Sequence, residues 1–202
     1  MKDLLDKLVK KNIPEAKQGT VASYIPELDK ARKDALGLYI IDVEGNEYYS
    51  GDWDTKFTIQ SISKIVTLML AILDNGEEYV FSKVGMEPTG DPFNSIKKLE
   101  TSSRRKPYNP LINAGAIAIA SMIKGKDVRD RFQRLLDFFR KISEDETLDV
   151  NYKIYCGESE TGNRNRAMGY FLKGDGIIEG NVEDALDIYF KQCSIEVTAK
   201  TL

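Results

Sequence analysis

Hydrophobic residues repeat at helical spacing near the N-terminus and again in the second half of the chain. The leucines and the valine of residues 4–9 form one apolar face, and we expect this short helix to end before Pro14, because proline lacks a backbone N–H. From residue 128 to residue 142, apolar residues recur one and two helical turns apart, with Arg, Asp and Lys opposite. This pattern predicts an amphipathic helix with a solvated outer face.

Between these helices the pattern changes to short β-prone runs. Residues 36–43, 47–50 and 57–59 favour strands, with a turn at Glu44-Gly45-Asn46, and together they predict a meander. The meander leads to Ser61 and to an apolar stretch over residues 65–73, for which Asn75-Gly76 supplies a helix C-cap signal. Small residues dominate positions 113–120, which predicts a central, tightly packed helix.

Two polar segments interrupt these elements. Residues 85–92 are rich in Gly and Pro, and we expect a surface loop beside a site. Residues 157–166 are dense in side chains that bind carboxylates, amines and amides, and we expect a polar loop there as well. No internal repeat or low-complexity tract is evident.

Composition limits the classes of function. A chain of 202 residues with 42% hydrophobic content can bury a real core in one domain, and a net charge of −3 gives no basic field for nucleic acid. The charged start lacks the apolar region of a signal peptide, and no stretch is long enough for a membrane span, so we expect a cytoplasmic protein without a membrane partner. Cys156 and Cys193 lack metal-ligand spacing and are interpreted as free, half-buried thiols.

The chain contains no histidine, which restricts its possible chemistry. A Ser/His/Asp triad and a His-ligated catalytic zinc both need an imidazole, so composition excludes them. A Ser-x-x-Lys pair remains possible, because a desolvated lysine amine can accept a proton from a serine one helical turn away. Twelve serines and twenty lysines give roughly one chance match to this motif, and the chain has four.

Context favours one of the four pairs. Ser61 and Lys64 stand at the start of a helix predicted to be buried, whereas the pairs that begin at Ser95 and Ser103 lie in polar segments and Ser121 ends an apolar one. At a helix N-terminus a serine hydroxyl lies at the positive end of the helix dipole and shares a face with the residue three positions later. By spacing alone, Ser61 would more often be an N-cap and Lys64 a solvated first-turn residue.

Several linked motifs resemble, in order, the signature blocks of the serine-dependent glutaminases. These blocks are Tyr24–Leu28, Gly51-Asp52, Gln60–Lys64, Pro92–Ser95, Asn109–Ile117, Arg164–Ala167 and Tyr189–Ser194. The resemblance runs from about Tyr24 to the last residue. It implies an α+β fold similar to that of serine β-lactamases and DD-peptidases, in which an antiparallel sheet is flanked by a mostly helical lobe. Residues 1–60 would then form the N-terminal helix and strands, and residues 61–202 the helical lobe.

The resemblance also implies the chemistry. Ser61 would attack the side-chain amide of L-glutamine, Lys64 would act as general base, and a glutamyl ester would then be hydrolysed. The substrate-binding residues carried over from the motifs are Tyr24, Gln60, Asn113, Glu158, Asn165 and Tyr189. Glu158 would face the α-ammonium and Tyr24, Asn113 and Asn165 the α-carboxylate. Without the motifs, Asn113 would more often be a helix cap, Glu158 a solvated acid and Tyr189 a core aromatic.

The same resemblance implies no cofactor, no metal ion and a homo-oligomer, a dimer or a tetramer. In the family the chain continues past the Cys193-Ser194 block with strands that carry a second catalytic tyrosine and a Lys-Ser-Gly triplet, whereas this sequence stops at Leu202. We therefore expect an incomplete domain that is nearly inactive alone, with Ser61 exposed and the sheet edge bare or covered by a neighbouring chain. Two other interpretations stay open, namely a silent binding or oligomerisation module and a Ser-x-x-Lys acyl-transfer enzyme that acts on peptides or lactams.

Overall fold

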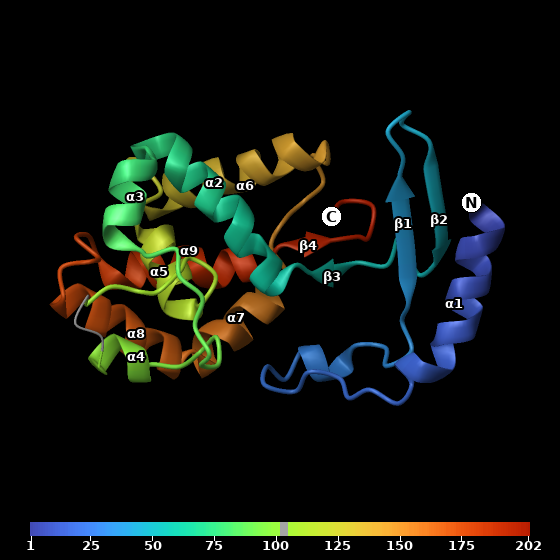
Figure 1. The fold of residues 1–202 in the computed structure, drawn as a ribbon, viewed down its shortest axis with the longest axis horizontal. Coiled ribbons are helices and arrows are strands. Elements are labelled where there is room, and N and C mark those ends of the chain that lie inside the picture. The colour runs from blue at the N-terminus through green and yellow to red at the C-terminus, as the bar shows by residue number, and fades with distance from the viewer. Residues whose placement is uncertain (102–104) are drawn as a thin grey trace.

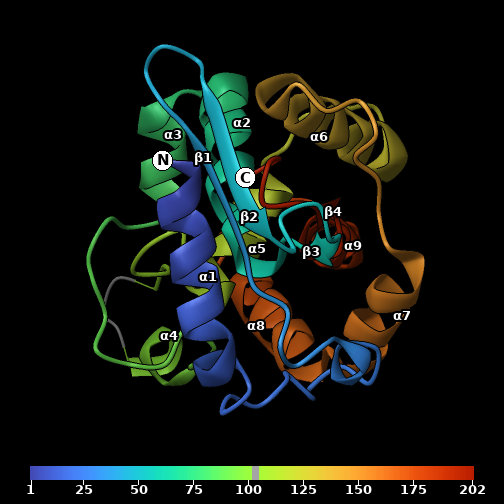
Figure 2. The same ribbon diagram turned by 90° about the vertical axis from the view of Figure 1, so that its right-hand side faces the viewer.

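The computed structural model describes residues 1–101 and 105–202, and these fall into two parts (Figure 1). On one side, helix α1 (Lys2–Ala16) packs on an antiparallel hairpin of β1 (Gly37–Ile41) and β2 (Glu47–Gly51). On the other side lie helices α2–α9, and Figure 2 shows α1 and the hairpin in front of them.

The hairpin follows the predicted β-prone runs closely. Gly37 pairs with Gly51 and Ile41 with Glu47, so the two strands are fully in register. Gly45 has a φ of +84° in the connecting turn, a conformation that glycine adopts without strain. Leu5 and Val9 of α1 are buried, as their spacing predicted, whereas Leu4 and Leu8 of the same predicted face are exposed.

Helix α1 does not end before Pro14, so that prediction is wrong. The helix continues to Ala16 and contains Pro14. A proline removes one N–H and so leaves the carbonyl of Lys10 without its helical partner. Lys10 is exposed, so water can hydrate this carbonyl, and the Lys17 N–H still donates to the carbonyl of Ile13 at 3.3 Å.

The predicted three-stranded meander is also wrong. Strand β3 (Phe57–Thr58) leaves the hairpin and pairs antiparallel with β4 (Glu196–Val197), close to the other end of the chain. The Ile59 N–H extends this pairing by donating to the carbonyl of Ile195 at 2.9 Å. Within the described residues the strands therefore form two separate two-stranded sheets.

The helical part is organised around α5 (Asn113–Ser121). Its residues from Asn113 to Ala120 are all buried, as the run of small side chains predicted, and α2 (Ser63–Asn75), α8 (Asn163–Gly174) and α9 (Val182–Cys193) pack around it. Gly115 is required here, because a Cβ at this position would lie 1.9 Å from the carbonyl oxygen of Asn109. The remaining helices are α3 (Glu77–Lys83), α4 (Lys97–Thr101), α6 (Val128–Ser143) and α7 (Tyr152–Thr161), with short 3-10 turns at Leu28–Lys30 and Gln60–Ile62.

Residues 157–166 are not the polar loop that we predicted. They form the end of α7 and the beginning of α8, with Gly162 at the junction. Asn151 caps α7 by accepting hydrogen bonds from the backbone N–H groups of Lys153 and Ile154. Polar residues are tolerated in these helices because one side of the junction faces a cavity, described below. Residues 85–92 lack regular structure, as predicted, and α6 begins and ends close to its predicted bounds.

Helix α2 ends at Asn75, and its C-cap residue Gly76 has a φ of +82°, as the C-cap signal indicated. The helix is only half buried, however. It buries Ser63, Lys64, Thr67, Leu70 and Ala71. The apolar side chains of Ile65, Met69 and Leu73 stay exposed, as does that of Ile62 just before the helix. Within residues 1–101 and 105–202, no helix has the length and apolar character that crossing a membrane requires.

Candidate active site

A cavity of about 410 Å³ lies where α5, the α7–α8 junction and α9 meet the turn before α2. Seven of the eight predicted site residues line it, namely Tyr24, Gln60, Ser61, Asn113, Glu158, Asn165 and Tyr189. They come from segments far apart in the chain, so the fold brings together what the sequence only suggested. The eighth, Lys64, is buried and hydrogen-bonded to Asn113.

Ser61 lies in the 3-10 turn Gln60–Ile62 that leads into α2, and its side chain is exposed. Gln60 has a φ of +50°, which is uncommon for a residue other than glycine and costs conformational energy. Its backbone and side chain are held on both sides: the Ser63 hydroxyl donates to the Gln60 carbonyl at 2.6 Å, and the Tyr24 hydroxyl donates to Gln60 Oε1 at 3.1 Å. These contacts fix the turn that presents Ser61 to the cavity.

Lys64 follows Ser61 by three positions and is 2% exposed. Its Nζ donates to the carbonyl of Leu111 at 3.0 Å and to Asn113 Oδ1 at 2.8 Å. Burial lowers the pKa of this amine, and the neighbouring Cys193 and Glu158 oppose the shift by smaller amounts. Among the described residues, no carboxylate forms an ion pair with Lys64, and the Ser61 hydroxyl forms no hydrogen bond.

Asn113 connects several parts of the site. Its Oδ1 accepts from Lys64, its Nδ2 donates to Asn165 Oδ1 at 3.1 Å, and its backbone N–H donates to the carbonyl of Phe93 at 2.8 Å. The first residue of α5 thereby joins α2, α8 and the segment before α4. Its position is set by contacts on three sides, and the interpretation as a simple helix cap fails, because its side chain caps no backbone N–H of α5.

Glu158 is buried on α7, and its Oε2 has no hydrogen-bond partner among the described residues. Burial raises the pKa of this carboxyl to about 7, although the charge of Lys64 lowers it somewhat. The interpretation as a solvated loop acid is therefore wrong. Tyr189 is 2% exposed and burial raises the pKa of its phenol, and Tyr24 has a pKa of about 12 for the same leading reason.

The other Ser-x-x-Lys pairs lie outside this cavity or outside the described residues. The Ser121 hydroxyl donates to the carbonyl of Ala118 in its own helix, and Lys124 Nζ contacts the carbonyl of Asp74. Ser103 is not among the described residues. Ser95 does not line the cavity.

Six further residues line the cavity that the sequence did not single out, namely Phe93, Asn94, Thr161, Gly162, Arg164 and Cys193. Most of them stand within the motifs quoted above, but nothing in those motifs said which way their side chains point. Cys193 is fully buried, and burial raises the pKa of its thiol to about 12, whereas Cys156 is exposed. Both thiols are free, as predicted, but neither is half-buried.

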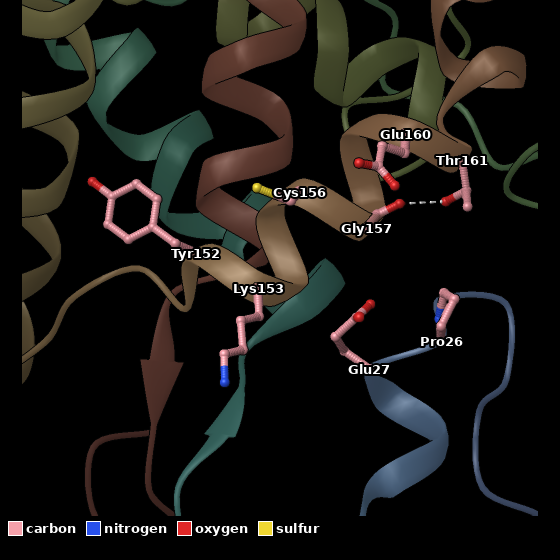
Figure 3. Close-up of a pocket in the computed structure, with 8 residues that line it drawn as sticks. All are labelled: Pro26, Glu27, Tyr152, Lys153, Cys156, Gly157, Glu160 and Thr161. Carbon is pink, nitrogen blue, oxygen red and sulfur yellow. Dashed lines mark hydrogen bonds between the residues drawn. The ribbon is translucent and has the colours of Figure 1, made fainter.

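A second cavity, of about 430 Å³, lies on the outer side of α7 (Figure 3). Pro26 and Glu27 line it on one side and residues of α7, namely Tyr152, Lys153, Cys156 and Glu160, on the other, while Thr161 lines both cavities. Gly157 also lines this cavity, and a Cβ there would lie 2.6 Å from Glu27 Oε2. Lys153 lines this second cavity, but no serine is among its described lining residues, so it has no counterpart of the Ser61 and Lys64 pair.

Comparison with solved structures places this geometry within a known fold. A Bacillus subtilis probable glutaminase aligns over 99% of this chain and 61% of its own, with a TM-score of 0.89 at 34% identity. A probable glutaminase from Bacillus subtilis complexed with 6-diazo-5-oxo-L-norleucine aligns over 96% of this chain and 58% of its own, with a TM-score of 0.85 at 33% identity. The protein therefore has the α+β, serine β-lactamase-like fold that the motifs implied.

Sequence comparison agrees. The glutaminase family model matches residues 19–202, a glutaminase of Fusobacterium nucleatum subsp. nucleatum is 71% identical over the whole chain, and glutaminase 2 of Clostridium perfringens is 54% identical. The chain belongs to the glutaminase family. It spans 66% of the length of each of these two relatives.

Proposed function

We propose that this protein hydrolyses the side-chain amide of L-glutamine to L-glutamate and ammonia, with Ser61 as nucleophile and Lys64 as general base. The observation that carries the proposal is the state of Lys64, a buried amine without a carboxylate partner among the described residues, one turn from a serine that opens onto the cavity. The names of the relatives and of the complex with 6-diazo-5-oxo-L-norleucine support glutamine as substrate.

The two acceptors around Lys64 suit a neutral amine. Such an amine has two N–H bonds and one lone pair, and Leu111 O and Asn113 Oδ1 can accept both hydrogens. The lone pair is then left for a third direction and can receive the proton of Ser61. Burial favours this neutral form at physiological pH because it destabilises the ammonium.

The proposed reaction proceeds in two halves. The Ser61 hydroxyl transfers its proton to Lys64 Nζ as Oγ bonds to the amide carbon, which gives a tetrahedral oxyanion. Collapse breaks the C–N bond, the protonated Lys64 returns a proton to the leaving nitrogen, and ammonia departs from a glutamyl ester on Ser61. Water then adds to the ester, again with Lys64 as base, and glutamate is released. The backbone N–H of Ser61, at the start of the helical segment, is one proposed oxyanion donor.

The rest of the cavity is assigned to the amino-acid end of glutamine. Glu158, whose buried Oε2 has no partner among the described residues, would bind the α-ammonium. Tyr24, Asn113 and Asn165 would donate to the α-carboxylate. Gln60 and Tyr189 complete the walls of the pocket.

The proposal has three further parts, which concern the domain organisation, the assembly and the location of the protein. Residues 1–60 and 61–202 are proposed as the two segments of one glutaminase domain, the assembly as a dimer or tetramer, and the location as the cytoplasm. The family resemblance supports the first two, and the two free thiols suit a reducing compartment. Light scattering coupled to size-exclusion chromatography tests the assembly.

The function is tested by ammonia release from L-glutamine. Ser61→Ala should reduce turnover by about a thousandfold or more with an unchanged far-UV circular dichroism spectrum, because it removes the hydroxyl that is proposed to form the ester. Ser121→Ala and Ser95→Ala are matched controls from other Ser-x-x-Lys pairs and should retain activity. The assay is run on the 202-residue chain and on a chimaera completed with the remaining third of the Fusobacterium nucleatum relative. Wild-type turnover by either Ser61→Ala protein would contradict the covalent mechanism.

A further inference from the structure

The cavity wall carries one acidic and one basic side chain, namely Glu158 and Arg164. The other described lining residues are uncharged amide, hydroxyl, phenol, thiol, glycine or phenylalanine groups, and Lys64 is buried beneath them. A free amino acid carries an ammonium and a carboxylate. A wall with one acid and one base therefore matches the charge pattern of such a ligand.

Arg164 is oriented but not neutralised. It stands in the first turn of α8, and its Nε donates to the backbone carbonyl of Asn94 at 2.7 Å. This bond fixes one edge of the planar guanidinium and leaves Nη1 and Nη2 without a hydrogen-bond partner among the described residues. Among the residues that the structure describes, no carboxylate lies within ion-pair distance of Arg164.

Arg166, the other arginine of α8, differs from Arg164 because its guanidinium is fully engaged in contacts within the protein. Arg166 Nη1 donates to the carbonyl of Ser159 at 2.6 Å and Nη2 to the Ser159 hydroxyl at 3.2 Å, while its guanidinium covers the Phe190 ring at 5.5 Å. Arg166 thus holds α7 against α8. Arg164, two residues earlier, lines the cavity instead.

We propose that Arg164 is a specificity-determining residue whose guanidinium supplies the positive charge for the α-carboxylate of the amino-acid substrate. This inference rests on the proposed function and deepens it, because Tyr24, Asn113 and Asn165 provide only neutral donors for that carboxylate. A charge-assisted hydrogen bond from Arg is stronger than one from an amide, and it selects against amides whose α-carboxylate is missing. Arg164 and Glu158 together would then make the site selective for a zwitterion.

Binding measurements on the Ser61→Ala protein test this inference without turnover. The probes are L-glutamine and γ-aminobutyramide, which is glutamine without its α-carboxylate, both measured by isothermal titration calorimetry. Arg164→Gln should weaken glutamine binding by about tenfold, the effect of one charge-assisted contact, and leave γ-aminobutyramide binding unchanged. Arg129→Gln, which removes an exposed arginine of α6, is the matched charge control and should change neither.

The outcomes separate a charge role from a positional one. If Arg164 acts only by holding the Asn94 carbonyl, Arg164→Gln will weaken both probes equally, and the inference is overturned; it is overturned too if neither probe changes. Arg164→Lys gives a second readout, because it keeps the charge and loses the Nε bond. Recovery of most of the glutamine affinity supports the inference, and affinity as low as that of Arg164→Gln refutes it. Failure of the parent protein to bind glutamine would count against the proposed function itself, before any Arg164 variant is considered.

Discussion

The two parts of the molecule differ in how their side chains are packed. The main apolar cluster runs from Ile59 to Val197 and, among the described residues, includes none before Ile59. Among residues 1–55, all of which the structure describes, only Leu5, Val9, Ile25 and Ser50 are buried. The candidate nucleophile and base lie on the well-packed side, whereas Tyr24 reaches the cavity from the sparsely packed one and is 61% exposed. The buried Lys64, the proposed base, is thus packed more tightly than Tyr24, which is proposed to bind substrate.

The largest expected effect on the free energy of unfolding comes from truncating one buried leucine in each of the two parts. Leu135 and Leu5 are both nearly inaccessible, but Leu135 lies in the main cluster and Leu5 between α1 and the hairpin. Leu135→Ala should lower the global free energy of unfolding by about 2–5 kcal/mol, the usual cost of a core cavity. Leu5→Ala should instead loosen α1 and the hairpin locally, with little effect on α5.

Amide hydrogen exchange measures both changes. Leu135→Ala should reduce protection throughout the helical part, and Leu5→Ala only in residues 1–55. Equal loss of protection in α5 for the two variants would show that the parts unfold as one unit and would remove the contrast.

Glu158 lies on the well-packed side. As the pH rises, ionisation of its carboxyl should lower the free energy of unfolding and raise the affinity for glutamine. Its folded-state pKa of about 7 exceeds the ordinary value of 4.5, so the unfolded chain loses this proton first as the pH rises. Stability conferred by the protonated carboxyl is therefore present below about pH 4.5 and is lost as the pH rises to about 7. Glu158→Gln should remove that loss and raise the free energy of unfolding in mildly alkaline solution by about 1–3 kcal/mol.

If Glu158 binds the α-ammonium as proposed, glutamine affinity should rise in the wild type as the pH passes about 7, because only the carboxylate attracts an ammonium group. Glu158→Gln should abolish this gain. Chemical denaturation and calorimetric titration at matched pH values report the two effects. A variant that is less stable than the wild type in alkaline solution would mean that the buried carboxylate has a partner.

Tyr24 on the sparsely packed side should give the smallest change. Tyr24→Phe removes the hydroxyl that donates to Gln60 Oε1 and keeps the ring. A neutral hydrogen bond contributes about 0.5–1.5 kcal/mol, so glutamine affinity should fall by roughly two- to tenfold and the melting temperature should hardly move. A large drop in melting temperature would show that Tyr24 is a structural residue.

Local pattern was sufficient to predict the hairpin, the buried α5 and the amphipathic α6, because each follows from periodicity, small side chains or a turn glycine. It failed where distant segments decide. The β3–β4 pairing joins residues that lie far apart in the sequence. The prediction at Pro14 failed for a local reason, because the carbonyl that Pro14 leaves without a helical partner belongs to an exposed lysine.

The site was predictable in its members but not in its geometry. The motifs named seven residues that meet in one cavity, yet the helical state of residues 157–166 was missed, because polar residues on a helix that faces a cavity look like a loop. Arg164 was missed because charge alone does not distinguish it from Arg166. Only the hydrogen-bond partners of the two arginines separate them.

The pairing of β3 with β4 has a consequence for how the protein is made. Glu196 and Val197 of β4 leave the ribosome long after their partners Phe57 and Thr58 of β3. Tyr189 and Cys193, which line the cavity, also emerge late, shortly before β4. Contacts between residues so distant in sequence carry a high loop-closure cost and form slowly. A nascent chain should therefore expose Ser61 and the turn that carries it until β4 has emerged and paired with β3, and the cavity wall is incomplete before that point.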